Sequence, residues 1–244
     1  MEKTVLKAFI MLFIISPFLF LSIKNTQKET IKIVFILFAF IISHQCLLYI
    51  PIAFKELCFV GSKWNWSGKI YAILGSFVFL LCYRKFKMKD YFLTFNQNKS
   101  FVKKGTWIVV IVLSIHLLIN VITFSPKIIS TETIFYQLTM PGIDEEIAYR
   151  GIMLGLLIKV LKSNILIFNL KAFNPSIVIT SILFGLAHGL NLSNSYEIIF
   201  NFPSFLSTFV MGVIWAWLTI KSGSILLAML SHNLGNSSQI ISFK

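Results

Sequence analysis

Ionisable side chains are concentrated in one stretch of this largely apolar sequence. The stretch reads Met140-Pro-Gly-Ile-Asp-Glu-Glu-Ile-Ala-Tyr-Arg150, so three acids and an arginine follow a Pro-Gly pair. On a helix, Glu146 and Arg150 are four residues apart and share one face, where they can form a charge-assisted pair. Glu145 points about 100° away from that face and has no cation on its own helix. The spacing predicts a supporting pair at Glu146 and Arg150 and an unpaired carboxylate at Glu145.

Two histidines occur at helical spacing in later apolar segments. Phe184 and His188 are four residues apart, and so are His232 and Asn236. A single buried histidine is more often a packed core residue than a catalyst, and Asp144 with Glu145 could instead cap a helix that starts after the Pro-Gly pair. Ionisable groups inside membrane helices are expensive and mostly functional, and one shared polar cavity explains all of them together.

Other polar residues receive smaller roles. His44 and His116 have no comparable neighbours, so we assign them to ordinary packing or polar contacts. Tyr149, Ser231 and Asn233 adjoin the cluster in sequence, and they could support it from behind.

The clustered residue types favour hydrolysis of an amide bond. A carboxylate beside an imidazole can deprotonate water, and an imidazole beside an amide N–H can stabilise the resulting oxyanion. The sequence contains no G-x-S-x-G, phosphate loop or dinucleotide fingerprint, which disfavours covalent catalysis. Glu145, His188 and His232 could instead hold Zn²⁺, which needs three protein ligands and an open position for water. No H-E-x-x-H is present, so such ligands would come from separate helices.

The elements that carry these residues are expected to be membrane helices. Of the 244 residues, 57% are hydrophobic, 13% are charged and 25 are Phe, against roughly 25% charged residues in soluble domains. Runs of about 20 apolar residues indicate membrane spans. The sequence predicts an all-α, polytopic bundle of about eight transmembrane helices with an intramembrane polar cavity. The expected spans are Val5 to Ile23, Ile31 to Ala53, Ile70 to Tyr83, Trp107 to Phe124, Phe135 to Val160, Ser176 to Leu190, Ile198 to Ile220 and Ser224 to Ser242.

We divide the chain into residues 1–130, with about four transmembrane helices, and residues 131–244, with a catalytic core of about four more. The basic N-terminal run is expected to be a retained first helix, because no small-residue cleavage site follows Ile23. Cys46, Cys58 and Cys82 lack metal or redox spacing and are expected to be free thiols.

The net charge of +13 resides in short loops. This placement fits the positive-inside rule and argues against a nucleic-acid partner. The basic connection from Arg84 to Lys104 should be cytoplasmic, while Lys69 falls in a connection on the opposite side. His188 then lies near the outer boundary, so the cavity would open outward.

Three motifs in order resemble the CAAX-protease and bacteriocin-processing (CPBP, or Abi) family, which includes the Ras-converting CAAX prenyl proteases. The family pattern E-E-x-x-x-R appears as Glu145, Glu146 and Arg150. F-x-x-x-H appears as Phe184 and His188, and H-x-x-x-N as His232 and Asn236. The resemblance covers residues from about 140 to 240.

The resemblance implies an intramembrane endopeptidase. Glu145 and His188 would activate the attacking water, His232 and Asn236 would stabilise the oxyanion, and Arg150 would hold Glu146. The family has been described both as metal-dependent and as metal-free glutamate proteases, so Zn²⁺ stays open.

The implied substrate is a membrane-associated, prenylated or bacteriocin-type peptide or protein, cleaved at the lipid bilayer. We expect a multi-pass protein of the bacterial cell membrane. Two alternatives are a non-catalytic bacteriocin immunity or scaffold protein and a proton-coupled transporter, since membrane acids and histidines also form proton relays.

Overall fold

Helices dominate the computed structural model, which describes residues 1–123, 130–167 and 170–238. The long helices are α1 (Glu2–Ser22), α2 (Lys28–Ala53), α3 (Trp66–Cys82), α4 (Lys99–Thr123), α7 (Pro175–Gly189), α8 (Phe202–Ser222) and α9 (Leu226–Ser238). Between α4 and α7, α5 (Thr131–Glu145), a π-helical segment (Glu146–Met153) and α6 (Leu154–Val160) follow one another without interruption. Short 3₁₀ turns occupy Lys55–Leu57 and Met88–Tyr91. The all-α bundle predicted from the sequence is confirmed.

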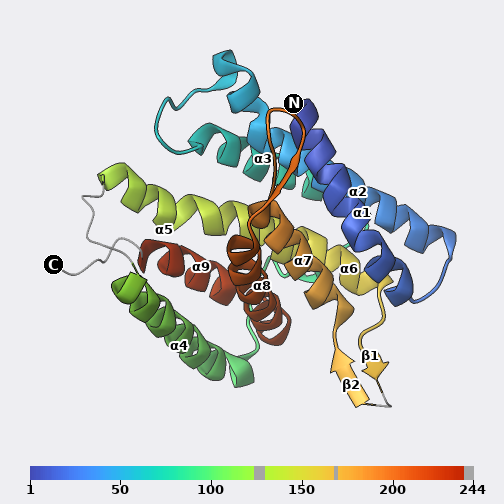
Figure 1. Cartoon of the computed structure of the whole chain (residues 1–244). Helices are drawn as coiled ribbons and strands as arrows, with labels where there is room; N and C mark the ends of the chain where they lie inside the picture. Colours follow the sequence, from blue (N-terminus) through green and yellow to red (C-terminus); the bar gives the residue numbers. More distant parts are fainter. Residues whose placement is uncertain (124–129, 168–169, 239–244) are drawn as a thin grey trace.

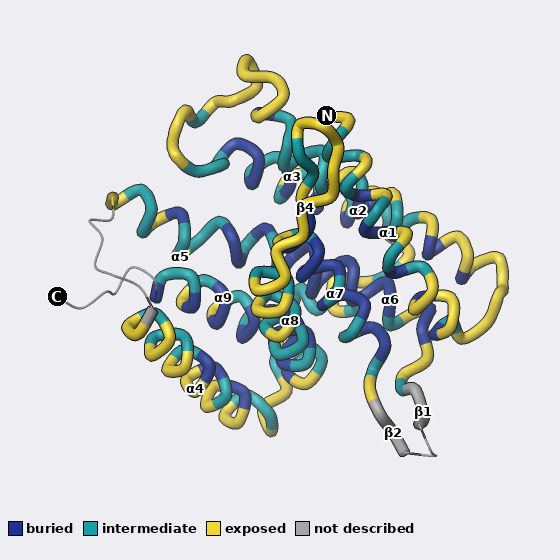
Figure 2. Tube along the Cα trace, in the orientation of Figure 1, coloured by how far each residue is buried: buried dark blue, intermediate teal, exposed yellow. Residues whose placement is uncertain are grey.

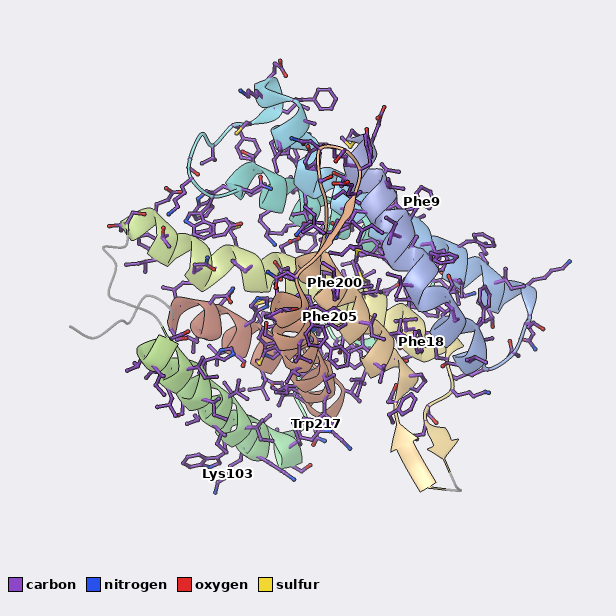
Figure 3. All side chains as sticks on the ribbon, viewed as in Figure 1. Phe9, Phe18, Lys103, Phe200, Phe205 and Trp217 are labelled. Carbon is purple, nitrogen blue, oxygen red and sulfur yellow. The ribbon has the colours of Figure 1, made fainter. Side chains whose placement is uncertain are left out.

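Several helices have the length and composition of membrane spans. Four of them, α1, α2, α4 and α8, are long and apolar enough to cross a bilayer, while α3 and α7 are apolar but shorter, as the sequence predicted. Their outward faces carry bare aromatic side chains: Phe13 is 81% exposed, and Phe9 and Phe18 point away from α1 (Figure 3). Such an apolar surface is expected to face lipid rather than water. The chain is a multi-pass membrane protein.

The C-terminal helices form the centre of the bundle. α7 packs along α8, α5 packs against α9, and α4 covers the other side of α9 (Figure 1). α1, α2 and α3 pack beside them, with α2 against α3 and α1 against α7. Burial is highest in the π-helical segment and α6, whereas α4 is exposed along its outer side (Figure 2). The segment that follows Glu145 therefore lies at the centre of the molecule.

Side-chain caps define where the central helices begin. Ser130 Oγ accepts a hydrogen bond from the Thr133 amide at the start of α5, and Asn174 and Asn201 cap α7 and α8 in the same way. Each of these side chains satisfies a backbone N–H that has no partner within its helix. The alternative in which a helix starts after the Pro-Gly pair is wrong, because α5 runs through Pro141 and Gly142.

Small hairpins were not predicted from the sequence. β1 (Ile165–Ile167) pairs with β2 (Leu170–Phe173), and β3 (Leu190–Leu192) pairs antiparallel with β4 (Ile198–Phe200). The expected span that began at Ile198 therefore begins only at Phe202, since Ile198 to Phe200 form a strand. Phe124 and residues 239–242, which ended two expected spans, lie outside the described residues.

The ends of several helices meet on one side of the bundle, where the basic loops also lie. Lys24 Nζ donates to the Ile158 carbonyl at 3.0 Å, Lys159 Nζ donates to Asp90 Oδ1 at 2.8 Å, and Lys85 pairs with Glu29. These contacts join the Arg84 to Lys104 connection and the loop after α1 to the end of α6 and the start of α2. Which membrane face this side adopts stays a prediction.

Candidate active site

Glu145 is the last residue of α5 and lies where three other helices converge on it. Its Oε1 accepts a hydrogen bond of 2.6 Å from Lys69 Nζ on α3. Its Oε2 lies 3.8 Å from His188 Nε2 on α7 and 3.7 Å from His232 Nε2 on α9. Oε2 is buried and has no hydrogen-bond partner among the described residues. One oxygen of Glu145 is therefore held by a cation, while the other faces two imidazoles.

His188 presents one ring nitrogen to Glu145 and anchors the other. It lies in the last turn of α7, where Nδ1 is 2.9 Å from the carbonyl oxygen of Phe184. A carbonyl can only accept, so Nδ1 carries the proton and Nε2 of the neutral ring has a free lone pair. The Phe184 ring also packs against the imidazole, with centroids 4.6 Å apart. The F-x-x-x-H spacing thus fixes both the orientation and the tautomer of His188.

His232 lies between the two consecutive glutamates. Its Nδ1 is 2.7 Å from Glu146 Oε1, and its Nε2 faces Glu145. The Trp215 indole stacks on the imidazole at 4.2 Å with an interplanar angle of 15°, and its own N–H donates to Ser231 Oγ at 3.1 Å. A carboxylate on one side and a stacked ring above leave the imidazole little freedom to rotate.

Arg150 holds Glu146 mainly through charge. Its Nη1 lies 3.2 Å from Glu146 Oε1, but the alignment is too poor for a hydrogen bond, and both side chains are almost fully buried. The guanidinium instead lies over Phe184, 4.2 Å from the ring centroid, and near Trp215 at 5.1 Å. Such cation–π contacts stabilise a buried arginine. The expected Glu146–Arg150 neighbours are thus found together, with aromatic rings as further partners.

A cavity of about 640 Å³ opens in front of these side chains. Asn236 lines it one helical turn beyond His232, in the position that the H-x-x-x-N spacing predicted. His116 lines it as well. The polar side chains around the cavity are Lys69, His116, Asn120, Gln137, Glu145, His188, Ser207, Thr208, His232 and Asn236. The structure thus gathers Glu145, His188, His232 and Asn236 around one space.

Three residues that adjoin the motif residues in sequence contact the site from different sides, namely Tyr149, Ser231 and Asn233. Asn233 Oδ1 accepts a 2.8 Å hydrogen bond from the Gly142 amide and so ties α9 to α5. Ser231 accepts from Trp215 as described above. Tyr149 is buried, and its hydroxyl lies 3.5 Å from Gln45 Nε2 on α2.

Lys69 is the residue that the sequence reasoning missed. We expected it in a connection between helices, but α3 begins at Trp66, and Lys69 is 9% exposed in its first turn. Asn65 caps this helix by accepting from the Gly68 amide at 3.0 Å. Recognition of Asn65 as the cap would have placed Lys69 inside the helix.

Asp144 and His44 complete the network behind Glu145. Asp144 Oδ2 accepts from Lys69 Nζ at 2.8 Å, and Asp144 Oδ1 lies 3.0 Å from His44 Nε2. Asp144 is fully buried, so its interpretation as a helix cap is wrong. His44 makes a polar contact as expected, and that contact connects it to the site through Asp144 and Lys69.

The clustered carboxylates and imidazoles differ from a metal site in one respect, the presence of Lys69. Within the described ranges, no group of three His, Cys, Asp or Glu side chains has the arrangement of a metal site. The lone pairs of His188 Nε2, His232 Nε2 and Glu145 Oε2 do converge, but the Lys69 ammonium 2.6 Å from the other Glu145 oxygen would repel a dication. The arrangement as it stands does not fit Zn²⁺, and we derive no step through a metal.

Fold and site together define a helical membrane protein with a buried glutamate–histidine centre. A family model described as Rce1-like, type II CAAX prenyl endopeptidase, matches residues 128–238. The matched segment contains all three motifs, and the match confirms the resemblance to the CAAX-protease and bacteriocin-processing family. Residues 128–238 are therefore similar to the CAAX-type peptidases that this family model describes. No curated protein and no solved structure matches the chain significantly.

Proposed function

We propose that this protein is an intramembrane endopeptidase that hydrolyses a peptide bond in a membrane-associated substrate. Glu145 and His188 activate the attacking water. The observation that carries the proposal is the unpartnered Glu145 Oε2, which faces two imidazole nitrogens across 3.8 Å and 3.7 Å. Glu145 Oε2 and His188 Nε2 are two acceptor atoms that face one space, and a single water can donate one proton to each.

The first step follows from these acceptors. A water between Glu145 Oε2 and His188 Nε2 donates one O–H to each, and its oxygen lone pair attacks the substrate carbonyl carbon. Glu145 takes up a proton as the C–O bond forms, and it then passes that proton to the amide nitrogen as the C–N bond breaks. The second water proton passes from the new carboxyl group to His188 Nε2, so the products are a carboxylate and an amine. Lys69, held on the other Glu145 oxygen, fixes the carboxylate for both transfers.

Stabilisation of the oxyanion falls to His232 and Asn236. His232 can donate from Nε2 only when both of its nitrogens carry protons, because Nδ1 donates to Glu146. The buried Glu146 carboxylate holds the His232 ring in this orientation, and the Asn236 amide supplies a second donor from the same cavity wall. Glu146 therefore supports catalysis without touching the reacting atoms.

The proposed substrate is a prenylated or bacteriocin-type peptide or protein, presented from the lipid bilayer. The family description supports a CAAX-type substrate, and the apolar helices around the cavity suit a lipid-linked chain. The proposed setting is a bacterial cell membrane.

Cleavage tests the proposal directly. Membranes from cells that produce the wild-type chain or Glu145→Gln are compared by proteomics for new peptide termini, and purified full-length protein is assayed on a farnesylated peptide. We expect Glu145→Gln and His188→Ala to lower the rate by about 10²- to 10⁴-fold, the usual contribution of a general base. Lys55→Gln is the matched control, since Lys55 is exposed and lies outside the cavity.

The alternative outcomes separate the function classes. Full activity in Glu145→Gln, at an unfolding temperature equal to that of the wild type, would overturn the proposed role of this residue. A protein that never cleaves but moves protons or confers protection would be a transporter or an immunity protein instead.

A further inference from the structure

A second, polar cavity lies beside the candidate active site. Its volume is about 490 Å³, and it is an open space bordered by the N-terminal turns of α1, the end of α2, the start of α3 and the β3–β4 hairpin. Figure 1 shows this hairpin beside the N-terminus of α1. The polar side chains that line it are Lys3, Thr4, Lys7, Gln45, Tyr49, Asn65, Lys69, Asn191 and Asn194. Lysines and amides predominate in this cavity.

The charges in this second cavity are not balanced. Lys3 Nζ donates to Asn194 Oδ1 at 2.8 Å, and Lys7 Nζ donates to the Ala187 carbonyl at 2.7 Å, so both partners are neutral. Neither lysine has an ion pair within the described part of the chain, and no carboxylate from that part lines the cavity. Two half-buried ammonium groups among amides form a site for an anion.

Lys69 cannot supply further attraction for such an anion. It lines both cavities, but its charge is already shared between Asp144 and Glu145. The unbalanced charge therefore belongs to Lys3 and Lys7.

The second cavity is connected to the reacting atoms through α7. Ala187, the acceptor of the Lys7 hydrogen bond, directly precedes His188. Asn191 in β3 follows His188 by three residues and lines the second cavity. Lys69 forms part of the wall between the two spaces. A peptide whose cleaved bond lies at Glu145 would therefore need only a few further residues to place an anion at Lys7.

We propose that this cavity binds the C-terminal carboxylate of the peptide substrate. The inference rests on the proposed function, and it deepens it: the enzyme would measure the position of the cleaved bond from the free end of the chain. A C-terminal carboxylate is the one anion that a peptide of any sequence carries. Lys7 and Lys3 pair with its oxygens, while the amide groups of Asn191 and Asn194 are available to donate further hydrogen bonds.

The test compares two versions of one farnesylated peptide, with a free C-terminal carboxylate and with a C-terminal amide. For the wild-type protein we expect KM to be at least about tenfold lower for the carboxylate, since one charged hydrogen bond has that value. Lys7→Gln and Lys3→Gln should remove this preference and leave kcat nearly unchanged. Lys55→Gln, on the same side of the bundle but outside the cavity, should keep it.

A binding measurement separates this proposal from the proposed function. The full-length Glu145→Gln protein is titrated with a tripeptide that ends in a free carboxylate and with the same tripeptide as a C-terminal amide. The titration is repeated with the double variant Glu145→Gln, Lys7→Gln. Selective, Lys7-dependent binding of the carboxylate without any cleavage by the wild-type protein would support the cavity while overturning the peptidase.

Two results would overturn the carboxylate site. One is normal cleavage with equal KM for carboxylate and amide peptides. The other is Lys7-dependent binding of phosphatidylglycerol nanodiscs that the tripeptide carboxylate does not reduce, which would assign the cavity to a lipid phosphate.

Discussion

His232 hydrogen-bonds to Glu146 through Nδ1 at 2.7 Å, which directs its other nitrogen into the cavity. The two residues are 86 positions apart in sequence, and their side chains are both almost completely buried. A carboxylate that holds the inner nitrogen of an imidazole sets its orientation and its proton, as at many metal and catalytic centres. Glu146 is therefore a positioning residue for His232, beyond its pairing with Arg150.

Replacement of Glu146 by Gln tests this positioning role. The amide keeps the volume and one acceptor but removes the negative charge that faces His232 Nδ1. We expect kcat to fall by roughly 10- to 100-fold, as for other residues that orient a catalytic group, with little change in KM. Steady-state kinetics on the farnesylated peptide measure both values.

A purely structural role for Glu146 would give a different result. The unfolding temperature of the variant would then fall in parallel with its activity. The fraction of active protein would decrease, while the kcat of that fraction would stay the same. A raised KM with unchanged kcat would contradict the positioning role.

Lys69→Met should destabilise the fold. The substitution leaves Asp144 and Glu145 buried without their shared cation, and removal of one partner of a buried pair costs about 3–5 kcal/mol. The drop in the unfolding temperature, measured in detergent, checks this value. The double variant Lys69→Met with Asp144→Asn should recover part of the loss, because one uncompensated charge is removed. An unfolding temperature equal to that of the wild type in Lys69→Met would contradict the ion network.

Gly142→Ala should disturb the contact between α5 and α9. A Cβ at this position would lie 2.7 Å from Asn233 Cγ, whose side chain is bonded to the Gly142 amide. Overpacking of this kind costs about 1–3 kcal/mol. It would also shift His232, the residue before Asn233, so we expect lower activity together with lower stability. Gly61→Ala is the control, since a Cβ there meets no atom within 4 Å.

Chelation distinguishes the two chemistries that the sequence left open. Because Lys69 already neutralises Glu145, we expect prolonged treatment with EDTA or phenanthroline to leave the cleavage rate unchanged. Metal analysis of the purified protein accompanies the assay. Loss of activity that added Zn²⁺ restores would show that Glu145, His188 and His232 bind a metal, and would replace the metal-free mechanism.

The sequence predicted the helices and the central residues because both depend on local spacing. Apolar runs set the spans, and intervals of four residues placed Phe184 with His188 and His232 with Asn236 on common helix faces. Ionisable groups are expensive to bury in membrane helices, and one shared cavity explains all of them together. The sequence predicted on this ground that Glu145 lies near both histidines.

Residues recruited from distant helices could not be predicted in this way. Lys69 and His44 reach Asp144 across 75 and 100 positions, and no local pattern marks such contacts. The π-helical segment after Glu145 was missed as well, because it depends on close packing of the surrounding elements. Gly151 in this segment illustrates the close packing, since a Cβ there would lie 3.3 Å from the Tyr91 carbonyl oxygen. Wider helical turns of this type are frequent at functional sites.

The position of Lys69 in the wall between two cavities has a consequence for how the protein can change over time. A substitution at Lys7 alters the second cavity alone, and a substitution at His188 alters the chemistry alone. Any replacement of Lys69 alters the surroundings of both at once. Substitutions in α1 and the β3–β4 hairpin can therefore change substrate preference while turnover is kept. A substitution at position 69 changes selectivity and turnover together.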